Sequence, residues 1–271
     1  MVSVLGMTTR NLTVGVAAAL LSLGAAGCAV EEATTTESGA NVITEGTLTV
    51  CTSLPFKPFE FRQGGEVVGF DIDMADRIAQ ANDLELELVI TGFEGIQSGQ
   101  ALNTNQCDMA AAGMTITDER AEVIDFSDGY FEATQALLTN DESITSLEDL
   151  DGKSLGVMTG TTGEIYVDEN APDGVEVRVF EDLGLQSTAV KSGQIDAAVQ
   201  DNGPLLDFAK DNPDVFVTAE FDTGEEYGFA VKKDGNDELL DSINTVISES
   251  REDGSYDELY EKWFGQAPAS E

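Results

Sequence analysis

Apolar and polar residues follow two alternating periods through the first half of the chain. Two stretches, TLTVCT and LELELVI, are apolar or alternate with a period of two, which is typical of strands. Between them Phe70, Met74 and Ile78 recur on one helical stripe. A second helical stretch and a short apolar strand, DMAAAG, come next, and this β-α-β-α-β order predicts a doubly wound parallel sheet. The expected strands cover 47–52, 84–90 and 108–113, and the expected helices cover 69–82 and about 95–103.

The same alternation resumes in the second half, so we expect two α/β lobes in succession. The segments 101–113 and 189–201 align without gaps and share alanine, glutamine, aspartate and alanine at the same places. Chance similarity between two helix-turn-strand units is the alternative explanation. Each unit ends at the carboxyl end of a strand, where open α/β sheets bind ligands. In this half the expected strands are 153–160, 175–180 and 195–201, and the expected helices are 162–169 and 183–191.

The C-terminal region predicts an amphipathic helix that packs on the first lobe. We expect Trp263 and Phe264 to anchor its final turn. The apolar stripe of this helix consists of Leu239, Leu240, Ile243, Val246 and Ile247.

The N-terminus has the layout of an export signal. An apolar run over 12–23 leads through small residues to Cys28, and it falls short of the roughly 20 residues that span a bilayer. The segment Ala26-Gly27-Cys28 resembles a bacterial lipobox, in which the cysteine is lipidated; cleavage that leaves the cysteine unmodified is the alternative. We expect residues 1–27 to be removed and 28–43 to form a flexible acidic tether.

The charge balance argues against several functions. The chain carries 52 acidic and 13 basic side chains and no histidine, for a formal net charge of -39. Binding to nucleic acid is disfavoured because phosphate contacts need clustered lysine and arginine. The absence of histidine excludes catalysis that uses an imidazole side chain. We interpret the acidity as a solvated surface suited to a salty, halophilic setting, with an ordinary acidic exported protein as the alternative. The acidic clusters lack calcium-loop spacing and GTTG is too short for a phosphate loop, so we expect no metal and no cofactor.

Two cysteines besides Cys28 remain in the expected mature domain, Cys51 and Cys107. If they lie on neighbouring parallel strands that end at Ser53 and Gly113, their positions differ by four residues, or about 13 Å at strand rise. A disulfide tolerates a Cα separation of about 7 Å. We therefore predict two free thiols.

The sequence GMTITDER offers polar groups where the strand DMAAA ends. Gly113 allows a ligand to approach the backbone, Thr115 contributes a hydroxyl, and Arg120 has a planar fork that matches a carboxylate. Asp201 ends the corresponding strand of the other lobe. An arginine and an aspartate on opposite walls would hold the carboxylate and the ammonium of a zwitterion. A surface salt bridge for Arg120 and a turn role for Asp201 are the alternatives.

Five segments resemble, in order, signature segments of the family 3 extracellular solute-binding proteins, the amino-acid receptors of ABC importers. They are LPFKPFEF, VGFDIDMADRIA, GMTITDERAEVIDFSDGYF, SLEDLDGKSLGVMTGTTGE and DGSYDELYEKWFG. The resemblance covers about residues 44–266. It implies an α/β, two-lobed, type II periplasmic-binding-protein-like fold, with a mostly parallel sheet flanked by helices in each lobe and two hinge strands between the lobes. It also implies that lobe 1 comprises 44–134 and 228–266, that lobe 2 comprises 135–227, and that 267–271 form a tail.

The same resemblance implies which residues contact the amino acid. Arg120 matches the carboxylate-binding arginine, Asp201 matches the ammonium-binding aspartate, and Gly113 and Thr115 match contacts of lobe 1. A turn of lobe 2 whose amides and hydroxyls also meet the carboxylate lies at a helix start, which attracts anions. That turn is matched by Thr161 and Thr162.

The remaining pocket residues bear on the ligand's side chain. Phe56 and Phe93 match aromatic residues that cover the ligand, with ordinary core packing as the alternative. A pocket of these two with Ser53, Met158 and Gln200 has no net charge, which favours a neutral polar or moderately apolar amino acid. Glu94 or Glu164 would change this expectation if either pointed inward.

The resemblance implies a binding protein rather than an enzyme. We expect a monomer, anchored outside the cell membrane or free in the periplasm, which captures an amino acid by lobe closure and delivers it to an ABC permease. Two alternatives share the fold. One is a secreted cyclic-acid dehydratase of the prephenate or arogenate type, for which Glu164 is the best candidate acid, and the other is a ligand-sensing module for a membrane kinase.

Overall fold

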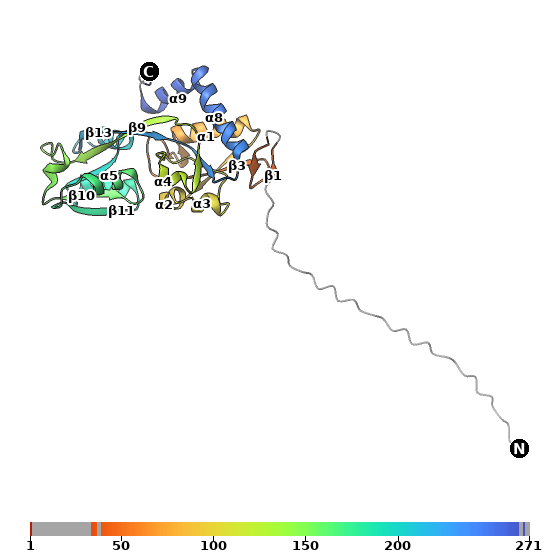
Figure 1. Ribbon diagram of the computed structural model, residues 1–271, viewed down its shortest axis with the longest axis horizontal. Coiled ribbons are helices and arrows are strands. Elements are labelled where there is room, and N and C mark those ends of the chain that lie inside the picture. The colour runs from red at the N-terminus through yellow and green to blue at the C-terminus, as the bar shows by residue number, and fades with distance from the viewer. Residues whose placement is uncertain (2–33, 37–38, 266–267, 269–271) are drawn as a thin grey trace. The chain divides into compact units, whose positions relative to one another are not determined.

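The computed structural model describes Met1 and residues 34–36, 39–265 and 268 (Figure 1). Everything below concerns the unit Glu32–Glu271. The predicted export signal and the predicted lipidation site at Cys28 lie outside the described residues.

The first of two five-stranded sheets is mixed. Its strands are β3 (Thr47–Thr52), β6 (Glu85–Ile90), β7 (Met109–Ala110), β8 (Ile124–Phe126) and β14 (Ala230–Lys232). They lie in the order β6-β3-β7-β14-β8. The strand β3 runs parallel to β6 and β7, as the β-α-β order predicted, whereas β14 is antiparallel to both of its neighbours. Only part of the sheet is therefore parallel, because β14 returns to it from the second lobe.

The second sheet repeats this arrangement. Its strands are β9 (Phe131–Thr139), β10 (Ser154–Met158), β11 (Glu176–Phe180), β12 (Ala197–Asp201) and β13 (Phe216–Tyr227). They lie in the order β11-β10-β12-β9-β13. The strand β10 is parallel to β11 and β12, and β9 is antiparallel to β12 and β13.

The antiparallel pair β9 and β13 joins the two lobes (Figure 1). The pair extends from Phe131 opposite Tyr227 to Thr139 opposite Phe216, and the register shifts twice, between Val217 and Ala219 and between Phe221 and Glu225. One strand carries the chain into the second lobe and the other carries it back. The predicted two-lobed α/β fold with two hinge strands is confirmed, whereas the lobe limits given above stay a prediction.

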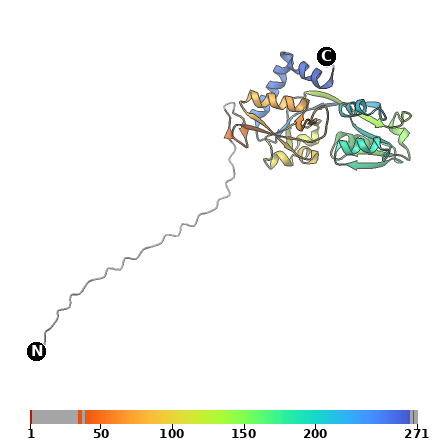
Figure 2. The same ribbon diagram turned by 180° about the vertical axis from the view of Figure 1, so that it is seen from behind.

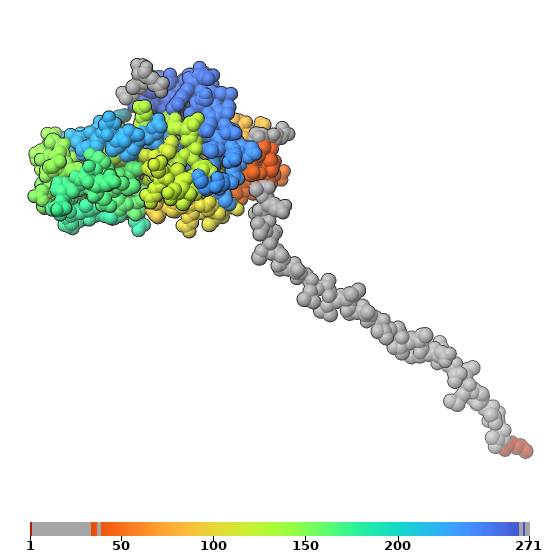
Figure 3. Space-filling view, viewed as in Figure 1, coloured from red at the N-terminus to blue at the C-terminus, as the bar shows by residue number. Residues whose placement is uncertain are grey.

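Helices flank both sheets. The first lobe has α1 (Phe70–Ala81), α2 (Phe93–Gln97), α3 (Gln100–Asn103), α4 (Asp118–Ala121), α8 (Asp237–Glu252) and α9 (Ser255–Phe264). The second has η1 (Leu147–Leu150), α5 (Thr162–Asn170), α6 (Leu183–Lys191) and α7 (Asn202–Asp211). The view from behind in Figure 2 shows α1 beside α8, which it contacts. In Figure 3 the C-terminal helices, drawn in blue, cover the N-terminal part of the first lobe.

Two helices expected to be continuous are broken at glycines. The stretch 95–103 divides into α2 and α3 at Gly99, whose φ of 72° lies in the left-handed region. A Cβ on Gly99 would come within 2.9 Å of the Val123 carbonyl oxygen, so the close approach also requires glycine. The C-terminal stretch divides into α8 and α9 at Gly254, which has a φ of 80°. Trp263 and Phe264 therefore end a separate helix instead of the final turn of α8.

Aromatic side chains fill the core next to the hinge strands. The ring of Phe59 lies 5.1 Å from that of Tyr227, which ends β13, and 5.3 Å from that of Phe264, which ends α9. Phe264 is also 5.7 Å from Phe70 at the start of α1. These edge contacts attach the C-terminal helix to the base of the hinge.

The packed part of the chain begins earlier than expected. Ala40 and Val42, assigned above to the tether, are buried in the core. The short strands β1 (Thr34–Thr35) and β2 (Asn41–Val42) form an antiparallel pair, and a second small pair consists of β4 (Phe61–Gln63) and β5 (Glu66–Val68).

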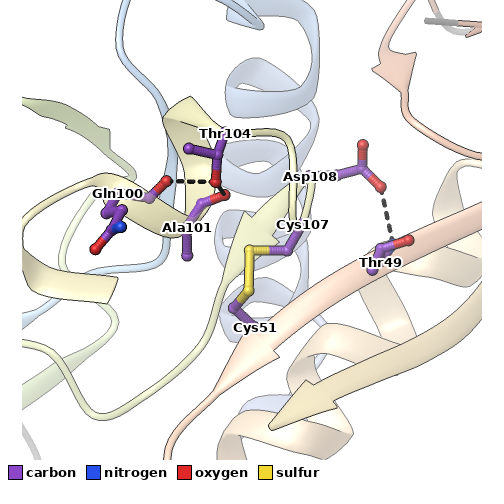
Figure 4. The surroundings of a disulfide bond; sticks show 7 residues. All are labelled: Thr49, Cys51, Gln100, Ala101, Thr104, Cys107 and Asp108. Atoms are coloured by element: carbon purple, nitrogen blue, oxygen red, sulfur yellow. Dashed lines mark hydrogen bonds between the residues drawn. A yellow bond between two sulfur atoms is a disulfide. The ribbon is translucent and has the colours of Figure 1, made fainter. Parts of the chain in front are cut away.

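The prediction of two free thiols is wrong. Cys51 and Cys107 form a disulfide with a Cα separation of 5.6 Å (Figure 4). The register pairs Cys51 with Ala110, and β7 contains only two residues. Cys107 therefore lies before the strand, in the turn that follows α3, so the distance calculated from a regular strand rise does not apply to it.

Candidate functional site

A cavity lies between the lobes, and the empty space inside it, counted together with the open solvent at its mouth, is about 400 Å³. Every residue predicted above to contact a ligand lines it. These residues are Ser53, Phe56, Phe93, Gly113, Thr115, Arg120, Met158, Thr161, Thr162, Gln200 and Asp201. The structure thus brings the predicted set together, and that each member contacts a ligand stays a prediction.

Arg120 is held rigidly on the wall of the first lobe. Thr117 caps the short helix α4 by accepting a hydrogen bond from the Arg120 backbone N–H at 3.2 Å. The guanidinium donates to the Thr115 carbonyl at 2.6 Å and, across the gap, to the Gly160 carbonyl of the second lobe at 2.9 Å. Burial lowers the pKa of Arg120, while the charge of Asp201 opposes that shift. The side chain stays a cation, and its bond to Gly160 shows the lobes in contact.

Phe93 has a more specific place than the resemblance implied. Its ring lies under the Arg120 guanidinium, with 5.3 Å between the ring centroid and Cζ. Phe93 therefore supports the cation from one side. Phe56 instead lies against Gly113, whose φ is +50° and whose Cβ, if present, would be 2.6 Å from the Phe56 ring. Glycine at 113 thus leaves room for the aromatic wall.

Thr161 and Thr162 form the turn at the start of α5, and both line the cavity. The Thr161 hydroxyl donates to the Met158 carbonyl at 2.8 Å and accepts from the Glu164 backbone N–H at 3.2 Å, which makes it the N-cap. The helix start carries partial positive charge from its free N–H groups. This wall of the second lobe can therefore share an anion with Arg120.

Asp201 is the buried anion of the opposite wall. It ends β12 and is 4% exposed. The Gln135 side-chain amide donates to its Oδ1 at 2.5 Å, and the Tyr227 hydroxyl donates to its Oδ2. Burial and the nearby charge of Glu225 raise the pKa of Asp201 to about 7, against the lowering effect of these bonds and of Arg120. A cationic group placed beside Asp201 would favour its ionised form.

Sequence reasoning missed the hinge residues that connect the walls. The Glu225 carboxylate on β13 accepts from the hydroxyls of Thr115 at 3.0 Å and Thr162 at 2.9 Å, one from each lobe. Gln135 on β9 donates to the same carboxylate. No local pattern marks either residue, because their role depends on the crossing of the two hinge strands.

Asp71 was also missed, although it lies on the predicted helix α1. Its Oδ2 accepts from the Gly113 backbone N–H at 2.9 Å, and its Oδ1 accepts from the Tyr130 hydroxyl at 2.7 Å. Burial raises the pKa of Asp71 to about 6, and these two bonds oppose the shift. Asp71 therefore fixes the loop that carries Gly113 into the cavity.

The acidic side chains of the cavity differ from those considered in the sequence. Neither Glu94 nor Glu164 lines it: the Glu94 carboxylate accepts from Gln97 at 2.9 Å, and that of Glu164 accepts from the Gly160 N–H at 2.7 Å. Glu60 and Asp182 line it instead. The expectation of a pocket without net charge is therefore incomplete.

Two lobes around one cavity, joined by two strands, are the architecture of a two-lobed solute-binding protein. The chain belongs to the bacterial extracellular solute-binding proteins, family 3, which it matches over residues 48–266. It is 35% identical over 235 residues to a "Probable histidine-binding protein" of Campylobacter jejuni, covering 85% of this chain and 90% of the relative. It is 40% identical over 210 residues to the "ABC transporter glutamine-binding protein GlnH" of Bacillus subtilis, covering 76% of each.

A solved structure of an amino-acid-binding protein is also similar to this chain. "An ancestral arginine-binding protein bound to arginine" superposes with a TM-score of 0.77 at 46% identity, covering 81% of this chain and 99% of that one.

The described residues contain neither a candidate membrane span nor a candidate metal site. Within the ranges that the structure describes, no helix has both the length and the hydropathy to cross a membrane. In that same part of the chain, no group of three or more acidic or cysteine side chains is placed to hold a metal ion.

Proposed function

We propose that this protein captures a free L-amino acid outside the cell and delivers it to the permease of an ABC importer. The observation that carries the proposal is the pair Arg120 and Asp201, both buried, on opposite walls of one cavity. The relatives described above, named for binding histidine, glutamine or arginine, support an amino acid as the ligand.

The α-carboxylate of the ligand would bind Arg120 and the start of α5. A guanidinium has five N–H donors, and backbone carbonyls take two of those on Arg120. The others remain for a carboxylate, which the hydroxyls of Thr161 and Thr162 can approach from the second lobe.

The α-ammonium would bind Asp201. Each oxygen of this carboxylate already accepts one bond, and a carboxylate oxygen has room for a second. Hydrogen bonds to charged groups contribute about 1.5–3 kcal/mol each. Because the arginine belongs to one lobe and the aspartate to the other, a ligand that holds both favours the closed conformation over the open one.

The alternative of a cyclic-acid dehydratase finds less support. Its candidate acid, Glu164, is bound to the backbone at the start of its own helix and does not line the cavity. Asp201 would also repel a dicarboxylate that lacks an ammonium group. Incubation with prephenate or arogenate should leave their absorbance unchanged, and loss of absorbance would establish the enzyme instead.

Membrane anchoring and the role in transport are proposals of their own. We expect Cys28→Ser to move the protein from the membrane fraction to the medium or periplasm. A sensing role would be favoured over transport if the gene lay beside a membrane kinase and not beside a permease.

The experiment that tests amino-acid binding is a thermal-shift screen against the twenty amino acids at high salt. At least one should raise the melting temperature of the wild type and bind with a measurable heat in calorimetry. Arg120→Ala should abolish both signals while the far-UV circular dichroism stays unchanged. Arg178→Ala is the matched control, because Arg178 is exposed and pairs with Glu176 at 3.0 Å far from the cavity lining. Unchanged affinity in Arg120→Ala would show that the site is misplaced.

A further inference from the structure

Glu60 is a buried carboxyl group without a hydrogen-bond partner. It is 0% exposed, and in the described part of the chain neither carboxyl oxygen has a partner. Its backbone is fixed by two bonds with Phe56, at 2.8 Å and 3.1 Å. The backbone of Glu60 is therefore fixed, and the residue is one of those that line the cavity between the lobes.

The other fully buried acids next to the cavity are satisfied. Asp71 accepts from Gly113 and Tyr130, and Asp201 accepts from Gln135 and Tyr227. A buried carboxyl group without such partners destabilises a fold. An unpaired acid that faces a binding cavity is accounted for if its partner is supplied by the ligand.

The charges of the cavity wall show which ligand would do so. Among the described lining residues, Arg120 is the single cation, whereas Glu60, Asp182 and Asp201 are acids. The α-carboxylate of an amino acid would use Arg120, and its α-ammonium would use Asp201. This leaves two acids and no cation for the ligand's side chain. A second positive charge on the ligand would lie beside these acids and favour their ionised forms.

We propose that Glu60 binds the N–H donors of a basic side chain, so that the preferred ligand is a cationic amino acid. This inference rests on the proposed function and replaces the earlier expectation of a neutral ligand, which left Glu60 and Asp182 out of the wall. The aromatic ring of Phe56 and the apolar side chains of Met158 and Leu183, which also line the cavity, suit the methylene stem of such a ligand.

Proton release gives a readout that a purely structural residue would not affect. Burial, together with the nearby charge of Asp71, raises the pKa of Glu60 well above its ordinary value. The raised pKa favours the protonated form of Glu60 in the free protein, and a cation bound beside it would favour the ionised form. Asp201, which Tyr227 and Glu225 also face, releases a proton for any amino acid. The excess release with a basic ligand therefore reports on Glu60.

The test compares three ligands of similar length by calorimetry near neutral pH. They are L-arginine, its uncharged near-isostere L-citrulline, and L-norleucine. We expect the wild type to bind arginine at least about tenfold more tightly than citrulline. Glu60→Gln should weaken the binding of arginine by about tenfold or more. It should change the affinities for citrulline and norleucine by less than about threefold. Titrations in buffers of different ionisation enthalpy should show extra proton release with arginine, which Glu60→Gln removes. Glu94→Gln is the control, because Glu94 is exposed and outside the lining.

The outcomes separate this inference from the proposed function. If amino acids bind but the wild type prefers a neutral one, or if Glu60→Gln weakens all three ligands equally or none, the inference is wrong and the proposed function stands. If no free amino acid binds the wild type, the proposed function itself fails. The melting temperature of Glu60→Gln shows whether this variant folds. If it does not fold, the inference is tested by the wild type, which should release more protons with arginine than with citrulline.

Discussion

The two lobes contain the same helix-turn-strand unit. It comprises the aligned segments 101–113 and 189–201. Asp108 before β7 accepts from the backbone N–H of Thr49 on β3 at 2.9 Å. Asp196, at the aligned position before β12, accepts from the backbone N–H of Ser154 on β10 at 2.7 Å. The two aligned segments therefore share one local structure, in which an aspartate binds the turn to the neighbouring parallel strand.

The two units differ in how the turn is held to that strand. The first lobe uses the disulfide between Cys51 and Cys107. At the aligned positions the second lobe has Gly156 and Ile195, and the Ile195 Cδ1 lies 2.5 Å from where a Cβ on Gly156 would be. The same gap is closed by a covalent bond in one lobe and by packing in the other.

The polar ends of the two units differ as well. Gly113 is held by Asp71 from within the first lobe, whereas Asp201 is held by Gln135 and Tyr227 of the hinge strands. We infer that the first wall is built before closure and that the second depends on the hinge. Four predictions test this contrast.

The largest effect should come from removing the covalent link. We expect the variant Cys51→Ala/Cys107→Ala to lose about 2–4 kcal/mol of unfolding free energy, as is typical for disulfides. Urea titration measures the loss, and it should fall on the first lobe. A thiol assay of the unfolded wild type without reductant should detect neither cysteine, and two reactive thiols would contradict the structure.

The next effect concerns pH. A neutral ligand's ammonium needs ionised Asp201, so the complex binds fewer protons than the free closed protein, in which the pKa of Asp201 is about 7. Affinity for alanine or norleucine should therefore rise with pH up to about 7, by up to about tenfold per unit, and level off above it. In the control Asp201→Asn the affinity should be lower, and it should no longer rise with pH below about 7. A slope that persists would assign the proton to another group.

A smaller effect should follow from filling the packed gap of the second lobe. We expect Gly156→Ala to cost about 1–3 kcal/mol of unfolding free energy, since its Cβ would overlap Ile195 and approach the Phe180 ring at 3.0 Å. Shortening the neighbour in Gly156→Ala/Ile195→Val should restore part of the loss. Gly92→Ala is the control, with no atom within 4 Å of the new Cβ, and an equal loss there would remove the packing explanation.

The smallest effect should be on an ion pair between the lobes. Lys57 of the first lobe lies 3.0 Å from Asp207 and 3.1 Å from Asp211, both on α7 of the second. Exposed pairs contribute about 0.2–1 kcal/mol, so Lys57→Met should weaken ligand binding two- to fivefold at low salt, mainly through faster dissociation. Lys232→Met is the control, because Lys232 bonds Asn105 within the first lobe at 3.0 Å. Stopped-flow release would contradict the prediction if both variants behaved alike.

Much of the fold could be predicted because the spacing of apolar residues identifies the helices and strands, and their order along the chain identifies the fold class. The strand 47–52 and the helix 183–191 were placed at their observed limits. The sequence placed Arg120 and Asp201 at one cavity because Arg120 comes after one short apolar strand and Asp201 ends another, and the carboxyl ends of such strands meet at one edge; that they bind a ligand stays a prediction.

What the sequence did not show depends on register and on distant segments. The disulfide was missed because the position of Cys107 depends on a turn and not on strand rise. Glu60 lies in a motif that was quoted for its resemblance, yet burial without a partner is visible only after folding. Glu225 acts through a hinge strand that pairs with residues about 90 positions earlier, as its bond to Gln135 shows.

The position of β14 has a consequence for how the chain reaches its native state. This strand, Ala230–Lys232, lies between β7 and β8, so the middle of the first sheet stays open until residue 232 of the 271 has been made. The second lobe, whose strands are contiguous from β9 to β13, needs no such late arrival. A chain that emerges from its N-terminus can therefore complete its second lobe before its first.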